Sequence, residues 1–554
     1  MKLNGAQLII RLLERQGITC IAGIPGGANL PLYDALTASP IKHVLTRHEQ
    51  GAGFIAQGMA RASGDPAVCF ASSGPGATNL VTAIADAHMD SIPLIAITGQ
   101  VSSALIGSDA FQEVDTFGLM LPITKHNWLV RSVHELLHVI PEAFRIACSG
   151  RPGPVAIDIP KDIQLQEIEI DDWPDVGQPD AQPVVEPRQI ERMHAMISQA
   201  QRPVLMIGGG VIHSGCYAEL RTFAERLQLP TVSTLMGLGA MPGEHPLFLG
   251  MLGMHGARAT NMVLAECDLL IGVGVRFDDR ATGKASTFCE NASIIHVDID
   301  AGEHGKIITP QLAIQADIGS VLRASLQGDQ QAVARAAWHE RIAFLKQRFN
   351  FSAHAEQDLF RPYPLLMKLA DLIDDDASIV TDVGQHQMWT AQYFPLQRSR
   401  QWFTSGGLGT MGFALPTAIG VALSETHGKV LCISGDGSIM MNIQELATAV
   451  EHDLNIKIII MNNQHLGLVR QQQALFYGAR FCAINNQRNT DFSALAIAMG
   501  AQGYDLAQAR DPAATLEQAL SMQGPCVINV PICEQEMVLP MVPPNAANSE
   551  MIGD

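Results

Sequence analysis

Residues 430–439, VLCISGDGSI, and residues 456–463, IKIIIMNN, determine how the carboxyl-terminal part of the chain is interpreted. Each stretch begins with an apolar run of strand length, and each run ends at polar residues. In an open parallel sheet, the carboxyl ends of the strands meet at one edge, where ligands bind. We therefore expect Asp436 and Asn463, 27 positions apart, to lie close together at such an edge.

The glycines on either side of Asp436 favour a diphosphate site. They let the backbone approach a phosphate, and the helix start that follows supplies N–H donors. One carboxylate and one amide oxygen, with a nearby backbone carbonyl, suit Mg²⁺, which prefers oxygen ligands and shares them with phosphates. A Gly-Asp-Gly sequence alone is weak evidence for a phosphate site, since it also occurs in ordinary turns. GDGS, the spacing to Asn463 and the two strands together resemble the diphosphate motif of the thiamine-diphosphate enzyme superfamily.

The composition predicts a large α/β protein. The 554 residues exceed the size of one hydrophobic core, and 47% hydrophobic residues with 49 glycines favour buried parallel strands joined by Gly-rich turns. We expect three doubly wound parallel-sheet domains, at residues 1–165, 190–345 and 360–540, with polar linkers between them. The segments CFASSGPGATN and LCISGDGSIMMN are similar, which leaves open either an internal duplication or a common strand-to-helix turn used twice.

Charge and cysteine usage exclude several classes of partner. The net charge of −19 disfavours binding to nucleic acid or to an anionic membrane. The ten cysteines are scattered without metal-ligand spacing, as in reduced core thiols. Residues 1–17 have charges at helical spacing and predict an amphipathic helix, and no apolar run is long enough for a membrane span. A cytoplasmic location is expected.

The superfamily resemblance also predicts a catalytic residue in the amino-terminal domain. Members have a glutamate there that touches the aminopyrimidine ring of the cofactor, and Glu49 in HVLTRHEQGAG stands in that place. Taken alone, Glu49 is equally a first-turn helix glutamate favoured by the helix dipole. As a catalytic acid it would stabilise the imino tautomer of the ring and help to remove the thiazolium proton. We expect Glu49 to be buried.

Further segments narrow the resemblance to one family. They include GIPGGANLPLYDAL, SSGPGATNLVTAIADAHMDSIPLIAITGQV, GVRFDDRATGK, TDVGQHQMW and TSGGLGTMGFALP, and they extend over nearly the whole chain. The chain resembles acetohydroxyacid synthase (acetolactate synthase) catalytic subunits, most closely the bacterial isozyme I type. The resemblance implies a pyrimidine-binding domain, a central Rossmann-like FAD domain and a diphosphate-binding domain. It also implies decarboxylative condensation of pyruvate with pyruvate or 2-ketobutyrate in branched-chain amino acid biosynthesis.

The resemblance also implies roles for individual residues. The residues matched to the thiamine diphosphate site, besides Glu49, are Gln385, His386, Gly409, Met411, Asp436, Gly437, Ser438, Asn463, His465, Gly467 and Leu468. Magnesium would be held by Asp436, Asn463 and the backbone carbonyl of His465, and Met411 would support the bent cofactor. The residues matched to the FAD site are Arg151, the stretch from His255 to Arg276 and the stretch from Asp298 to Asp317. FAD in this family is structural, so no redox step is implied.

Substrate contacts are expected from Arg280, Gln112 and Lys161. Arg280 would pair with the carboxylate of the second keto acid, although an exposed arginine paired with Asp278 or Asp279 is the alternative. Gln472 stands where many family members have Trp, which predicts a weaker preference for 2-ketobutyrate over pyruvate.

The sequence leaves alternative functions and assembly states open. A pyruvate oxidase-like flavin oxidoreductase and a flavin-free catabolic acetolactate synthase are the two main alternatives. Glyoxylate carboligase is disfavoured because Glu49 is present, and a non-catalytic relative would be expected to lack Glu49 or Asp436. The resemblance implies a homodimer or a dimer of dimers with sites between subunits, and a small regulatory subunit.

Overall fold

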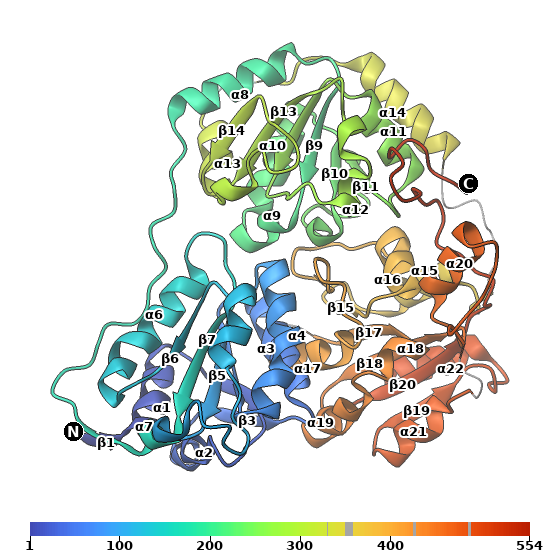
Figure 1. Cartoon of the computed structure of the whole chain (residues 1–554). Coiled ribbons are helices and arrows are strands. Elements are labelled where there is room, and N and C mark those ends of the chain that lie inside the picture. The colour runs from blue at the N-terminus through green and yellow to red at the C-terminus, as the bar shows by residue number, and fades with distance from the viewer. Residues whose placement is uncertain (329–330, 350–357, 425–427, 486–488, 554) are drawn as a thin grey trace.

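The computed structural model describes residues 1–328, 331–349, 358–424, 428–485 and 489–553. In this described part, three six-stranded parallel sheets are flanked by helices, as expected for the α/β class (Figure 1). One sheet falls within each of the three expected domains. Residues 350–357 of the expected second linker lie outside the described residues.

The amino-terminal sheet has the strand order β3-β2-β4-β5-β7-β6. Its strands are β2 (Cys20–Gly23), β3 (Lys42–Leu45), β4 (Ala67–Ala71), β5 (Leu94–Gln100), β6 (His126–Leu129) and β7 (Val155–Pro160). Its helices are α1 (Gly5–Arg15), α2 (Leu30–Leu36), α3 (Glu49–Ser63), α4 (Pro75–Asp90), α5 (Thr116–Met120), α6 (Leu136–Cys148) and α7 (Lys161–Leu165). The short strands β1 (Lys2–Asn4) and β8 (Glu167–Glu169) pair antiparallel. The expected amphipathic helix is α1, which Asn4 and Gln7 start with a capping box.

The central sheet has the order β11-β10-β9-β12-β13-β14. Its strands are β9 (Pro203–Ile207), β10 (Thr231–Ser233), β11 (Phe248–Met251), β12 (Leu269–Val273), β13 (Ser293–Asp298) and β14 (Leu312–Gln315). Its helices are α8 (Pro187–Gln199), α9 (Gly209–Ser214), α10 (Tyr217–Leu227), α11 (Arg258–Glu266), α12 (Asp279–Thr282), α13 (Ile318–Leu326) and α14 (Ala336–Arg348). Residues 171–186 contain no helix or strand and run along one side of the molecule to α8 (Figure 1).

The carboxyl-terminal sheet has the order β16-β15-β17-β18-β20-β19. Its strands are β15 (Ser378–Thr381), β16 (Trp402–Phe403), β17 (Val430–Gly435), β18 (Ile456–Asn462), β19 (Gln502–Asp505) and β20 (Cys526–Pro531). Its helices are α15 (Pro362–Leu372), α16 (Gln385–Tyr393), α17 (Ala414–Leu423), α18 (Asp436–Ile439), α19 (Leu446–Glu451), α20 (Gly467–Phe476), α21 (Phe492–Ala498) and α22 (Pro512–Ser521).

The first and third sheets have the same strand order. Strands β2 to β7 of the first sheet correspond in order to strands β15 to β20 of the third sheet, so that β2 matches β15 and β7 matches β20. The similar segments seen in the sequence correspond as well, because one follows β4 and the other follows β17. The identical order favours an internal duplication over a common turn used twice.

Helices α3 and α17, which are counterparts in this duplication, hold the first and third domains together. A Cβ atom at Gly58 would collide with the carbonyl oxygen of Thr417, and one at Gly420 would collide with that of Ile55. Glycine at both positions therefore lets the two backbones touch. Phe54 and Phe413 pack edge to face beside this crossing, with ring centroids 5.3 Å apart.

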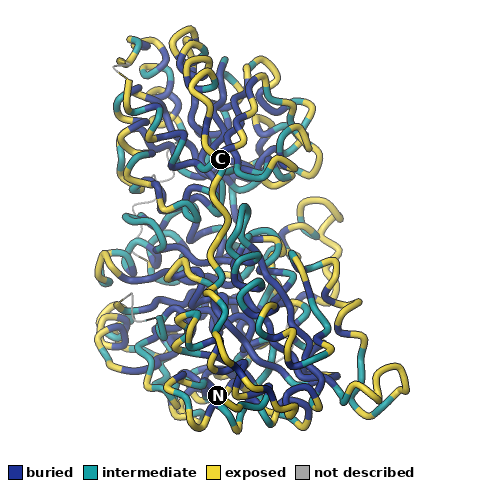
Figure 2. The backbone as a smooth tube through the Cα atoms, turned by 90° about the vertical axis from the view of Figure 1, so that its left-hand side faces the viewer, coloured by how far each residue is buried: buried dark blue, intermediate teal, exposed yellow. Residues whose placement is uncertain are grey.

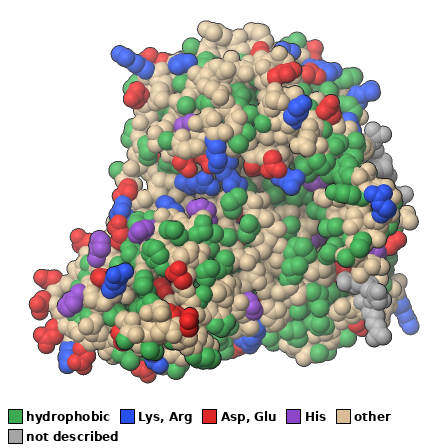
Figure 3. Space-filling model, in the orientation of Figure 1, with side chains coloured by type: hydrophobic (Ala, Val, Ile, Leu, Met, Phe, Trp, Pro, Cys, Tyr) green, Lys and Arg blue, Asp and Glu red, His purple; other side chains and the backbone are tan. Residues whose placement is uncertain are grey.

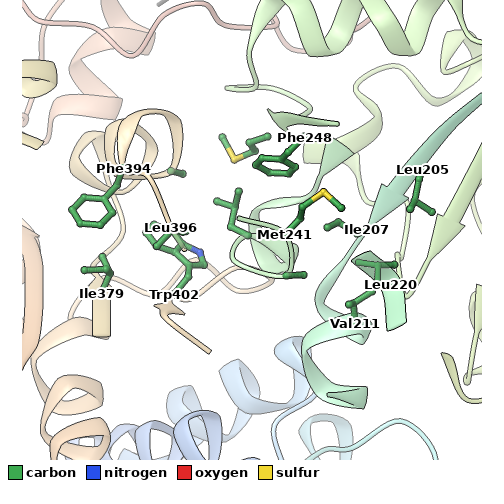
Figure 4. Packing of buried hydrophobic residues seen from close by; sticks show 14 of the residues in the cluster. Leu205, Ile207, Val211, Leu220, Met241, Phe248, Ile379, Phe394, Leu396 and Trp402 are labelled. Atoms are coloured by element: carbon green, nitrogen blue, oxygen red, sulfur yellow. The ribbon is translucent and has the colours of Figure 1, made fainter. Parts of the chain in front are cut away.

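Buried apolar residues fill the sheets and continue between the domains (Figure 2). One cluster joins the central and carboxyl-terminal domains: Met241 and Phe248 of the central domain belong to the same cluster as Leu396 and Trp402 (Figure 4). Residues 541–553 return to the central domain, where Val542 N donates to the Met254 carbonyl oxygen (2.8 Å). Within the described residues, none of the helices has the length and hydrophobicity needed to cross a membrane.

Candidate functional site

The GDG turn lies where the sequence predicts it, at the carboxyl end of β17. Asp436 begins α18 and is 3% exposed. Gly435 pairs with Met461 in the neighbouring strand β18, so Asn463 follows that strand at the same edge of the sheet. A Cβ atom at Gly437 would lie 2.8 Å from the Leu466 side chain, so a larger residue would displace it. The carboxylate and the amide oxygen thus share one edge.

Gln385, Asn463 and Gly467 form a tight polar group beside this turn. The Asn463 side-chain amide donates to Gln385 Oε1 (2.9 Å), and His465 N donates to Asn463 Oδ1 (3.0 Å). A Cβ atom at Gly467 would collide with Gln385 Oε1. Hydrogen bonding therefore fixes the orientation of the Asn463 amide, and its oxygen stays on the side of His465.

His386 supplies a buried ring without a complete set of partners. It is 5% exposed, and burial lowers its pKa to about 3. Its Nε2 atom is buried and makes no hydrogen bond in the described structure. The ring lies against Gly435 with its Nδ1 and Cε1 atoms, so it forms part of the wall beside the GDG turn. A buried nitrogen without a partner is the kind of group that a polar ligand satisfies.

Met411 and Gly409 lie on the segment that joins β16 to α17. The methyl group of Met411 is 3.9 Å from the place where a Cβ of Gly437 would stand, so Met411 faces the GDG turn. Gly409 has a φ angle of +70°, a conformation that favours glycine. Both positions agree with the expected support beneath a cofactor.

Glu49 is the first residue of α3, close after β3. Its Oε2 atom accepts a hydrogen bond from the Asn79 side chain (2.9 Å), and its Oε1 atom faces Gly76 of the adjacent helix α4. The sequence predicts a buried Glu49, and in the single chain this residue is half-buried. The backbone just before it docks on its own carboxyl-terminal domain, because Arg47 N and His48 N both donate to Glu445 Oε1.

A cavity of about 1250 Å³ lies where the three domains meet. Basic side chains gather in the hollow between the central domain and the lower half of the molecule (Figure 3). Arg151 and the end residues of both stretches that the resemblance assigns to FAD line the cavity: His255, Arg276, Asp298 and Asp317. Gly409, Leu468 and Arg280 line it as well, so the expected flavin and thiamine sites adjoin.

Several groups in the cavity have the character of a ligand site. Burial raises the pKa of Asp298 to about 6 and lowers that of His255 to about 4. The Nδ1 atom of His255 is buried and has no hydrogen-bond partner in the described structure. Arg151 pairs with Glu303 (2.8 Å). The cavity exceeds the usual ~300–1,000 Å³ of a small-molecule pocket, which suits a dinucleotide.

The three expected substrate residues are dispersed in the single chain. Arg280 lies in α12 with 70% of its side chain exposed, and its distance of 3.8 Å to Asp279 makes that ion pair weak. Asp278 caps α12 instead of pairing with the arginine. Gln112 has a φ angle of +63° in a loop beside Gly74, and Lys161 begins α7. Gln112, Lys161 and Glu49 are not among the residues that line the cavity.

Sequence reasoning missed a set of buried acids near the site. Asp86 and Asp90 of α4 and Asp382 after β15 are all at most 5% exposed. Two carboxylates spaced four residues apart on an otherwise apolar helix were the available signal for the first pair. Nothing in the local pattern of Asp382 distinguishes it from an ordinary strand-end residue.

Comparison with known proteins agrees with the three-part architecture. Residues 3–119 match the family described as thiamine pyrophosphate enzyme, N-terminal TPP binding domain. Residues 190–325 match the central domain of such enzymes, and residues 382–530 match their C-terminal TPP binding domain.

Full-length relatives extend the comparison over the whole chain. The chain is 57% identical to the acetolactate synthase isozyme 1 large subunit of Escherichia coli, over 100% of this chain and 98% of the relative. It is 46% identical to the isozyme 2 large subunit of the same organism, over 99% of each chain. It is 43% identical to the acetolactate synthase large subunit of Cyanidium caldarium, over 99% and 97%.

Proposed function

The chain belongs to the family of acetolactate synthase large subunits, and from that premise we propose which of its residues carry the reaction. It is a thiamine-diphosphate-dependent acetolactate synthase of branched-chain amino acid biosynthesis, which condenses pyruvate with a second 2-keto acid and releases CO₂. The placement of Asp436 and Asn463 at one sheet edge, beside two glycines where an added Cβ would press on the His386 and Leu466 side chains, carries this assignment on the structural side.

The GDG turn is proposed to hold Mg²⁺ and the diphosphate. Asp436, the Asn463 side-chain oxygen and the His465 carbonyl form an oxygen-only ligand set, which is the set that Mg²⁺ prefers. Gly437 and Ser438 at the start of α18 would offer backbone N–H groups to the phosphates, and the buried ring of His386 beside Gly435 would supply a further polar contact. The remaining proposed contacts are Gln385, Gly409, Gly467 and Leu468.

Glu49 and Met411 act on the ring system of the cofactor. Thiamine diphosphate, when bound, supplies a carbon nucleophile and accepts the electrons released as CO₂ leaves. Glu49 holds a proton at the ring nitrogen of the aminopyrimidine, and Asn79 fixes the orientation of its carboxyl group. Met411 supports the cofactor by packing from the side of the GDG turn.

Arg280 is proposed to bind the carboxylate of the acceptor keto acid. Its guanidinium lies at the cavity and has two weak partners, Asp279 at 3.8 Å and the Met254 sulfur at 3.3 Å, so it can form a bidentate pair with a substrate. Gln112 and Lys161 are proposed as further substrate contacts. We propose both pyruvate and 2-ketobutyrate as acceptors.

FAD is proposed as the occupant of the large cavity. All five assigned residues line it, and the buried, unpartnered Nδ1 of His255 fits a polar ligand. Gly209 and Gly210, the first residues of α9 after β9, also line the cavity and allow close backbone approach. This site disfavours a flavin-free catabolic acetolactate synthase.

The active unit is proposed to be a homodimer, or a dimer of dimers, with sites between subunits. Residues near the metal turn expose apolar side chains: Leu408 at 44%, Met440 at 46%, Met441 at 52% and Val469 at 44%. A partner subunit would cover this surface and bring its own Glu49 to it. The relatives are named large subunits, which supports a small regulatory partner. All ten cysteines are free thiols, which supports a cytoplasmic location.

Incubation with pyruvate tests the proposed cofactors. With thiamine diphosphate, Mg²⁺ and FAD present, we expect one 2-acetolactate and one CO₂ from two pyruvates. Omitting thiamine diphosphate or Mg²⁺ should abolish the reaction. The flavin absorbance should stay oxidised during turnover, since no redox step is involved. Bleaching of the flavin with formation of acetyl phosphate or acetate would instead identify a pyruvate oxidase-like enzyme.

Gln472 is proposed to set the acceptor preference. It lies in α20 and lines the cavity as an exposed side chain. Changing Gln472→Trp should raise the preference for 2-ketobutyrate over pyruvate by roughly tenfold, because packing one extra methyl group is worth ~1–3 kcal/mol. The measurement is the ratio of the two acetohydroxy acids formed in a mixture of both acceptors. Gln472→Asn should leave that ratio unchanged, and an unchanged ratio in the Trp variant would exclude this role.

A further inference from the structure

Residues 404–414, which we name the support segment, join β16 to α17 and carry Gly409 and Met411. Four glycines occur in this stretch, at positions 406, 407, 409 and 412. Glycine loses more conformational freedom on folding than any other residue, so such a segment holds one shape only when other groups fix it. The structure shows which groups do so.

Two carboxylates of α4 hold the first part of the support segment. Asp86 accepts hydrogen bonds from the hydroxyl groups of Ser405 and Thr410, the latter at 2.9 Å. Asp90 accepts from the backbone N–H groups of Gly406 (3.0 Å) and Gly407 (2.7 Å). The amino-terminal domain therefore positions a loop of the carboxyl-terminal domain.

Arg61 of α3 completes the group. Its guanidinium contacts Asp86 (3.2 Å) and Asp90 (2.9 Å), and it also donates to the Thr404 carbonyl oxygen (3.1 Å). All three charged side chains are buried, and desolvation together with the charge of Asp90 raises the pKa of Asp86 to about 6. Other charged or titratable side chains also pack here. Arg400 donates to the Arg61 carbonyl oxygen, His213 bonds to the Asp90 carbonyl oxygen, and the guanidinium of Arg276 lies beside Gly407.

Asp382 holds the other end of the support segment. It is fully buried, and its Oδ1 atom accepts from Gly412 N (2.8 Å). Its Oδ2 atom accepts from the Ser434 hydroxyl (3.2 Å), next to the GDG turn. Met411 therefore lies between two anchored points, one tied to α4 and one tied to the end of β17.

We propose that Asp86, with Asp90 and Arg61, is a positioning residue that sets the height of Met411 beneath thiamine diphosphate. The inference rests on the proposed role of Met411 as the cofactor support. Thr410 is the residue before Met411, and its backbone N–H also donates to Ser405 Oγ (2.8 Å), so Asp86 closes a small ring of hydrogen bonds around it. Burying a charge destabilises a protein unless the charge is paired. Here three paired charges are buried at the junction of two domains, beside the site.

The experiment uses the full-length chain with its cofactors. Asp86→Asn should raise the half-saturating concentration of thiamine diphosphate at least tenfold and lower kcat, with little change in the KM for pyruvate. The near-ultraviolet circular dichroism of the bound cofactor should change as its bent shape relaxes. Thr410→Val, which removes one hydroxyl without changing shape, should move the same readouts in the same direction, and Thr410→Ser should restore them.

Lys457→Met is the matched control for lost stability. Lys457, near the start of β18, is a fully buried charged residue of the carboxyl-terminal sheet, and it donates to the Met522 and Gly524 carbonyl oxygens at the end of that sheet opposite the GDG turn. The Lys457→Met substitution should lower the Tm without changing the half-saturating concentration of thiamine diphosphate or the circular dichroism of the bound cofactor. Wild-type cofactor saturation in both Asp86→Asn and Thr410→Val would overturn the proposal. If Asp86→Asn fails to fold, wild-type saturation in Thr410→Val alone would overturn it. Failure of the proposed function would give a different result, because the wild-type chain would then form acetolactate without depending on thiamine diphosphate.

Discussion

Glu49→Gln should fold normally yet lose most acetolactate formation, by about 10²–10⁴-fold in kcat, the range of a lost acid–base group. Glutamine has nearly the same shape and can keep the Asn79 contact, but it cannot exchange a proton with the aminopyrimidine ring. The loss should therefore fall on kcat, while binding of thiamine diphosphate and FAD is little changed. An unchanged Tm would show that α3 still packs on α17.

Steady-state kinetics with pyruvate, together with cofactor titrations, measure this effect. Glu14→Gln is the matched control, because Glu14 is also a half-buried glutamate of the amino-terminal domain that accepts a side-chain hydrogen bond, from Ser39 (2.7 Å). It should keep wild-type kcat. Near-wild-type turnover in Glu49→Gln would remove Glu49 from the reaction.

The sequence predicted the parts of the molecule that depend on local pattern. Apolar runs followed by glycine turns identified the parallel strands, because strands that are buried on both faces are apolar along their whole length. The GDG turn and Asn463 were placed at one sheet edge because parallel strands leave no other arrangement. The similar turns after the two apolar strands indicated an internal duplication as one of two explanations, and the identical strand order of the first and third sheets favours it.

The parts that were not predicted depend on contacts between distant residues. Asp86 and Ser405 are 319 positions apart, and no local rule pairs a helix carboxylate with a hydroxyl at that distance. The return of residues 541–553 to the central domain likewise follows from tertiary packing, since Asn548 donates to the Ala281 carbonyl oxygen (2.8 Å). The half-burial of Glu49 differs from expectation because the exposure of a carboxyl group depends on which distant residues cover it, and here the Asn79 side chain and Gly76 lie beside it.

Asp436→Asn should raise the Mg²⁺ concentration needed for activity and lower activity at ordinary Mg²⁺ on the order of a hundredfold or more, since the metal contributes several kcal/mol of charge stabilisation. The carboxylate is 3% exposed, and its charge is the only formal negative charge among the three proposed ligands. An amide oxygen keeps the geometry and loses that charge. High Mg²⁺ should therefore restore part of the activity.

A Mg²⁺ titration of thiamine diphosphate binding measures the change. Asp491→Asn is the matched control, since Asp491 caps α21 through Ala494 N and asparagine caps equally well. It should leave the Mg²⁺ dependence unaltered. A wild-type Mg²⁺ requirement in Asp436→Asn would exclude Asp436 as a ligand.

Combining the two defective chains tests where the site is built. If each site takes Glu49 from one subunit and Asp436 from the other, a dimer of Glu49→Gln with Asp436→Asn has one doubly defective site and one native site. Random mixing makes half of the dimers mixed, so about a quarter of all sites should regain wild-type activity. Each variant alone should remain nearly inactive. Restored activity in co-expressed chains therefore requires the site to lie between subunits, whereas no restoration would place Glu49 and Asp436 of one chain in the same site.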